Sequence, residues 1–216
     1  MRNALFGTKS LFRFIVSALL TLSIFIPRLS HSEINAGFLP SFQLSNDANQ
    51  PVITYTLNHA MLETVDETPL LRIYADGKVL AHYPVYMKKA GDYQFQLSKP
   101  ALVALIQSLI SDGVLDFDKN SARQYKQQMD EQKRLSSGTA YYVSDSSKTI
   151  IKINLQNYRS SVIASPISSL QKKFTWDNLQ QDAKRYPGSS ALTKAAAGAH
   201  KLRTLLDQTS VPSNRQ

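Results

Sequence analysis

The sequence predicts an α+β fold, in which an antiparallel β-sheet built from hairpins packs against several α-helices in a single domain. Three observations predict it. An Asp-Gly pair divides two β-prone runs within residues 69–86, polar and apolar residues alternate over 92–97, and apolar residues recur at helical spacing after residues 98 and 175. Of the 216 residues, 43% are hydrophobic, which is enough for one packed core.

The first 32 residues have the pattern of a secretory signal peptide. A basic start without acids precedes residues 14–26, which carry no charge, and Ser30 and Ser32 are small residues two positions apart. This run is shorter than the ~20 residues that span a bilayer. We therefore expect cleavage after Ser32 and a periplasmic or secreted protein. Cleavage after Ala36 and an uncleaved anchor helix are the alternatives.

The net charge of +9 includes this leader. Residues 1–32 contain four basic residues and no acidic one, so the remaining chain has 21 basic and 16 acidic residues, a net charge of +5. That mild excess, without a one-sided basic helix, argues against nucleic acid as the partner. We expect an unknown protein or an anionic envelope component instead, and no stable membrane span after cleavage. The absence of cysteine excludes disulfides, thiolate metal sites and a lipoprotein anchor.

The domain follows a polar segment. Residues 33–50 are mostly small and polar and predict a flexible tether. The domain itself is expected over residues 51–210, with a frayed tail at 211–216. Its first strand is predicted at residues 52–57, where β-branched and aromatic residues are dense.

The strongest local signal is the Asp76-Gly77 pair within residues 69–86. It predicts a hairpin with a type I′ turn, which needs positive φ at both central residues. Pro84 cannot donate to a ladder, so the second arm ends there or lies at an edge. Residues 92–97 alternate apolar and polar side chains and predict a half-buried strand.

Helices are predicted on both sides of a second hairpin. Ser98 is a suitable N-cap for a helix over 99–112, and residues 118–135 predict a solvated helix or a mobile excursion. The second hairpin is expected over 138–155, with its tip at residues 145–147. Two further helices are expected, at the ranges 176–186 and 190–207, the first of them capped by Thr175.

Motifs for nucleophilic catalysis, phosphate binding and metal binding are absent from the sequence. Asp116, Asp118 and Asn120 are spaced like the start of a calcium loop, but Ser121 and Gln127 stand where that loop needs glycine and glutamate. The histidines have no metal-ligand spacing. We therefore expect no catalytic residue, no metal and no cofactor.

The loop over residues 82–93 is the candidate binding surface, because aromatic and cationic side chains suit anionic or protein partners. The simpler interpretation is that its tyrosines pack against the sheet and its lysines protect an edge strand. The candidate residues are His82, Tyr83, Tyr86, Lys88, Lys89, Asp92 and Tyr93.

The stretch LRIYADGKVLAHYPVYMKKAGDYQFQLS, residues 71–98, resembles a block found in a family of uncharacterised secreted bacterial proteins. LISDGVLDFD at 109–118 and WDNLQQDAKRYP at 176–187 extend the resemblance. It implies export and a shared fold, and it carries over no activity and no catalytic residue.

We therefore expect an exported, non-enzymatic binding module. One alternative is a hydrolase-like enzyme in which His82 pairs with Asp76 or Asp92 as a small acid–base site. The other is an inhibitor-type module whose Asp76-Gly77 hairpin inserts into a partner.

Overall fold

The computed structural model describes residues 40–45, 47–59, 66–140 and 146–208. By their contacts the residues of the chain form two units, Met1–Ile34 and Asn35–Gln216, and every described residue belongs to the second. The predicted signal peptide lies outside the described residues. These residues form four helices and a seven-stranded antiparallel sheet, which confirms the predicted α+β class.

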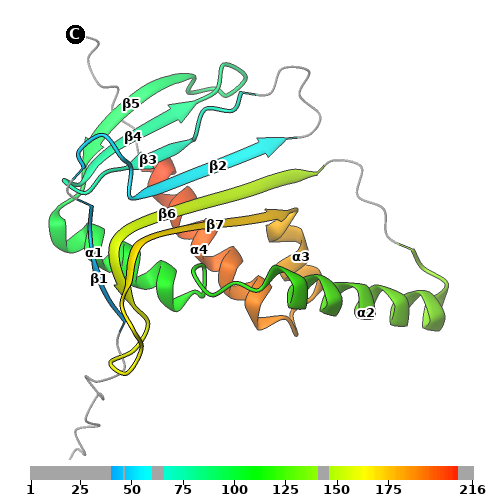
Figure 1. Cartoon of the computed structure of the whole chain (residues 1–216). Helices are drawn as coiled ribbons and strands as arrows, with labels where there is room; N and C mark the ends of the chain where they lie inside the picture. Colours follow the sequence, from blue (N-terminus) through cyan, green and yellow to red (C-terminus); the bar gives the residue numbers. More distant parts are fainter. Residues whose placement is uncertain (1–39, 46, 60–65, 141–145, 209–216) are drawn as a thin grey trace, which may run out of the picture. The chain divides into compact units, whose positions relative to one another are not determined.

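The sheet is organised around one long strand. β6 pairs along one side with β7, and along the other side first with β2 and then with β1. From β2 the sheet continues through β3 and β4 to β5, and all pairings are antiparallel (Figure 1). The strands are β1 (Ser41–Gln43), β2 (Ile53–His59), β3 (Leu71–Ile73), β4 (Lys78–Tyr83), β5 (Gly91–Gln96), β6 (Ser147–Arg159) and β7 (Ile167–Asp177).

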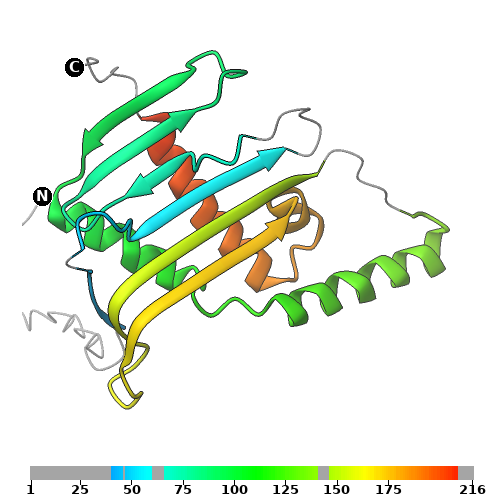
Figure 2. The same cartoon turned by 45° about the horizontal axis from the view of Figure 1, so that its top comes forward.

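The helices are α1 (Lys99–Ser111), α2 (Lys119–Ser137), α3 (Leu179–Arg185) and α4 (Ser190–Asp207). α1 and α4 lie against the same face of the sheet, whereas α2 runs away from it (Figure 2). In α2 only Ala122 is buried. None of the helices in the described ranges is long and apolar enough to cross a membrane.

The core lies between the sheet and the two covering helices. Alternate strand residues such as Ile53, Ile73 and Ile153 are almost fully buried there, together with Ile106 of α1 and Leu202 of α4. Fully burying side chains of this size stabilises the fold by about 1.5–3 kcal/mol each.

α4 approaches α1 closely at Gly198. A Cβ atom at this position would lie only 3.0 Å from Val114 and 3.3 Å from Leu109. Position 198 of α4 therefore needs a residue without a side chain, because Leu109 of α1 and Val114, which follows α1, leave no room for one.

The prediction of a flexible tether is wrong for its described C-terminal part. Ser41–Gln43 forms β1 against the end of β6, and Phe42 packs on the core. The side-chain amide of Asn157 also donates to Gln43 Oε1 at 2.7 Å. Phe42 is thus packed on the core and its backbone is paired with β6. The polar residues around it made this segment resemble a tether in the sequence.

The first hairpin forms as predicted, but its turn is not type I′. Of the two central residues, Gly77 has a positive φ of 88° and Asp76 does not have a positive φ. Gly77 N donates to Tyr74 O at 3.0 Å, and Tyr74 N donates to Lys78 O at 2.9 Å. This pattern is a type I turn closed by one left-handed glycine, so a three-residue loop joins the strands.

The second hairpin lies further along the chain than predicted. β6 begins at Ser147, where the tip was expected, and its partner is β7, joined to it by residues 160–166. Residues 138–140 are not a strand, and 141–145 lie outside the described residues. Trp176 is part of β7 rather than of a helix, and α3 starts only after Asn178. Pairing with β6 overrides the helical spacing in this segment.

Three local predictions are confirmed. Ser98 caps α1 by accepting from Ala101 N, and β5 is half-buried with alternating exposure. Of the two alternatives for the polar segment over 118–135, a solvated helix and a mobile excursion, the helix is confirmed: it is α2, whose N-cap is Asp118. The carboxylate of Asp118 accepts from the backbone N–H of Asn120, as expected for an acid at a positive helix end.

Candidate functional site

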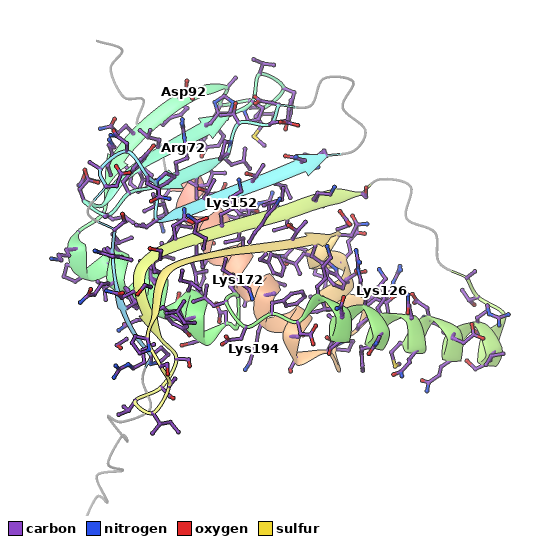
Figure 3. The ribbon with its side chains drawn as sticks, viewed as in Figure 1. Arg72, Asp92, Lys126, Lys152, Lys172 and Lys194 are labelled. Atoms are coloured by element: carbon purple, nitrogen blue, oxygen red, sulfur yellow. The ribbon has the colours of Figure 1, made fainter. Side chains whose placement is uncertain are left out.

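No helix of the described residues covers the sheet face opposite α1 and α4, which we call the open face (Figures 1 and 2). The strand registers place Lys173 of β7 opposite Lys152 of β6, and Arg72 of β3 opposite Thr54 of β2. Thr54 is in turn opposite Lys152. Opposite residues share a face, so Lys173, Lys152 and Arg72 form one line across the sheet, which we call the cationic row. Figure 3 labels Lys152 and Arg72.

The cationic row is an electrostatically unfavourable arrangement for the protein alone. Neighbouring strands lie about 4.8 Å apart, so the row extends over about 14 Å. Lys152 and Lys173 are exposed and directly opposite each other, and like charges in that position destabilise a sheet. None of the three cations forms an ion pair with another described residue. The Nε atom of Arg72 is buried without a hydrogen-bond partner among these residues.

A histidine held between two carboxylates lies on the same open face. His82 Nδ1 donates to Asp92 Oδ1 at 2.7 Å, and His82 Nε2 donates to Asp66 Oδ2 at 2.8 Å. The side chain of His82 is 19% exposed, and that of Asp92 is 81% exposed. We call these three residues the histidine cluster.

The contacts within the histidine cluster favour the protonated, charged form of His82. Burial acts to lower the pKa of His82, but the hydrogen bonds and charges of Asp92 and Asp66 raise it overall. The hydrogen bonds from His82 and then Thr68 lower the pKa of Asp66 from 3.8 to about 2. With both ring nitrogens donating, the imidazolium has no free nitrogen to accept a proton from a substrate.

The structure brings together only part of the acid–base site that the sequence suggested. The expected pairing of His82 with Asp92 forms, because the two residues are opposite each other in β4 and β5. Asp76 is not involved, since its carboxylate accepts from the backbone N–H of Lys78 in the turn. Asp66 was missed, because it reaches His82 from the segment that leads into β3 and shares no strand register with it.

The other candidate residues fall into two groups. Tyr83 is buried and donates its hydroxyl to the carbonyl of Leu206, and Tyr93 packs edge-on against it with ring centroids 5.3 Å apart. Both rings therefore have packing roles. Tyr86 is 45% exposed, and Lys88 and Lys89 are also exposed. These three residues remain accessible to a partner.

Two cavities lie beside α2 rather than on the open face. The larger, of about 730 Å³, is bordered by Met129 and Leu135 of α2 and by Tyr186. The smaller, of about 310 Å³, surrounds Lys126 and Asp182. Neither includes a residue of the histidine cluster.

The tip of the first hairpin is fastened to the body of the domain. Gly77 O accepts from Leu97 N at 2.9 Å, and the side chain of Gln96 donates to Asp76 O at 2.6 Å. This packing opposes the inhibitor-type alternative, in which the same tip inserts into a partner.

The fold and the site define an α+β protein with a one-sided sheet and a cationic open face. Comparison with models of known protein families, with curated proteins and with solved structures finds no match. Within the described ranges, no group of three or more histidine or acidic side chains is arranged to hold a metal ion.

The histidine cluster makes stability depend on pH. Because the pKa of His82 is raised in the folded protein, its contribution is fully present below pH 6.5 and is lost as the pH rises through the folded-state pKa. Because the pKa of Asp66 is lowered, its contribution is present above pH 3.8 and is lost as the pH falls towards 2.

We expect His82→Gln to lower the free energy of unfolding by about 1 kcal/mol at a pH of about 5.5, and by less at a pH of about 9. Urea unfolding at both values measures the difference. If the difference in the free energy of unfolding between wild type and variant is the same at both pH values, the ion pairs of His82 do not contribute to stability.

Proposed function

We propose that this chain is an exported, non-enzymatic binding protein whose open sheet face binds an anionic component of the cell envelope. The observation that supports the proposal most strongly is the cationic row of Lys173, Lys152 and Arg72. These side chains share one face and have no ion-pair partner among the described residues. A partner with closely spaced phosphate or carboxylate groups would relieve the repulsion between the two lysines.

The surroundings of the row support a macromolecular partner rather than a small substrate. The cations are spread over about 14 Å of a sheet surface instead of converging in a cleft. The ring nitrogens of His82 are both occupied by carboxylates, which disfavours the hydrolase-like alternative. Lys88 and Lys89 of the loop after β4 are further exposed cations.

The proposal is tested by the affinity of the purified protein for heparin, used as a soluble polyanion. We expect the double variant Lys152→Glu/Lys173→Glu to bind about 30-fold more weakly at low ionic strength, taking about 1 kcal/mol for each lysine near an anionic surface. The wild-type affinity should fall steeply as salt is added, because binding releases counterions.

A charge-matched control comes from the helices. Lys184 of α3 and Lys194 of α4 are exposed and are not part of the open face (Figure 3 labels Lys194). Lys184→Glu/Lys194→Glu changes the net charge by the same amount and should leave most of the affinity intact. Equal losses in the two double variants would mean that only net charge matters, and the proposed surface would be wrong.

Export is tested separately by N-terminal sequencing of the protein recovered outside the cytoplasm. The proposal expects a sequence that starts at Glu33. An intact Met1 terminus would contradict cleavage of the leader.

A further inference from the structure

The loop that joins β6 to β7 carries an exposed aliphatic tip. Ile163 is 97% exposed, Val162 is 59% exposed, and Ile167, where β7 begins, is 48% exposed. The twelve residues from Ser160 to Gln171 contain no charged side chain. Both views show this hairpin end extending past the rest of the sheet (Figures 1 and 2).

The hairpin behind this tip is basic up to its far end, where Asp177 of β7 is opposite Lys148 of β6. Residues 147–176 contain no acidic side chain. The first cation behind the tip is Arg159, the last residue of β6. The cations of the hairpin are Lys148, Lys152, Arg159, Lys172 and Lys173.

We propose that Val162 and Ile163 insert into the headgroup region of an anionic phospholipid bilayer. Adjacent aliphatic side chains in front of a basic surface have the chemistry of a peripheral membrane anchor, in which apolar burial and attraction to anionic lipid act together. The electrostatic part of this inference rests on the function proposed above.

Lipid fits this tip better than a protein pocket does. Interface anchors between proteins are enriched in tryptophan, tyrosine and arginine, and none of these occurs in residues 160–171. Residues 147–176 also contain no acidic side chain that anionic headgroups would repel, and Asp177, the one acid of the hairpin, lies at the end opposite the tip. Tip insertion needs no helix long enough to span the bilayer.

The experiment uses a probe at the tip. The protein has no cysteine, so Ile163→Cys provides a single attachment point for an environment-sensitive fluorophore. Leu135→Cys is the matched control, because Leu135 is an aliphatic residue of α2 that is 72% exposed. With vesicles of phosphatidylglycerol and phosphatidylcholine, we expect the emission at position 163 to shift to the blue and the emission at position 135 to stay unchanged.

Sedimentation with the same vesicles gives the affinity. We expect Val162→Ser/Ile163→Ser to reduce vesicle binding at least about tenfold and to leave heparin binding unchanged, whereas Leu135→Ser should change neither. All of these positions are exposed, so circular dichroism should report an intact fold.

The outcomes separate this inference from the proposed function. If the wild type binds heparin but not anionic vesicles, or binds vesicles without a shift at position 163, tip insertion is wrong and the open-face proposal stands. If the tip variant loses vesicle binding while Lys152→Glu/Lys173→Glu retains both ligands, tip insertion is supported and the open-face proposal is wrong.

Discussion

Asp182→Ala is expected to lower the free energy of unfolding by about 3 kcal/mol. Asp182 is 2% exposed. Its carboxylate accepts from Lys126 Nζ at 2.8 and 2.9 Å and from Trp176 Nε1 at 2.8 Å. The substitution leaves the buried indole N–H and the lysine without their shared acceptor.

The loss of stability is at the lower end of the range for broken buried ion pairs, because Lys126 is 32% exposed and can turn to water. Glu131→Ala is the control. Its partner is Arg134 on the exposed end of α2, and both side chains are more than half exposed. Removing that solvent-exposed pair should lower the free energy of unfolding much less than Asp182→Ala does. Equal losses in urea unfolding would mean that the contacts of Asp182 do not hold α2, β7 and α3 together.

Gly77→Ala is expected to destabilise the protein by about 2–4 kcal/mol, because two effects act at the same position. The backbone at Gly77 has φ +88°, which L-residues rarely adopt. A Cβ atom there would also lie 2.3 Å from the carbonyl oxygen of Leu97. The alanine can be accommodated only if the junction between β5 and α1 moves.

Gly113→Ala separates the two effects. Gly113 has a similar φ of +67°, but no other atom would lie within 4 Å of an added Cβ. It should therefore lose only about 1 kcal/mol, the conformational part. If the two alanine variants unfold at the same urea concentration, the packing of the hairpin tip against Leu97 contributes nothing.

Local patterns were enough to predict the parts of the fold whose sequence and environment agree. Ser98 and the apolar spacing after it predict α1, and the alternation of Tyr93 and Phe95 predicts β5. In each case the residues that carry the signal lie within the element or next to it: Ser98 directly precedes α1, and Tyr93 and Phe95 are part of β5. Propensity and tertiary structure therefore point to the same answer.

β7 was missed because its sequence supports two interpretations. Trp176, Leu179 and Ala183 recur at helical spacing, but Leu170, Phe174 and Trp176 also share one face of a strand. Pairing with β6, which no local pattern reveals, decides between them. The short alternation of Phe174, Thr175 and Trp176 was the only local signal for the strand, because Lys172 interrupts the pattern before it.

The candidate site depends even more on long-range register. Lys152 and Lys173 become opposite each other only through the pairing of β6 with β7, and Arg72 joins their row through β2. The sequence suggested the pairing of His82 with Asp92 because both belong to predicted neighbouring strands. It could not suggest Asp66, whose position depends on the path of the chain before β3.

Amide chemical-shift mapping can show whether the open face binds anions. Heparin is titrated into isotopically labelled protein, and the shift of each backbone amide is followed. We expect the largest changes on β3, β6 and β7, around Arg72, Lys152 and Lys173. Changes confined to α2 or to residues 82–93, with these three positions unaffected, would rule out the open face as the binding surface.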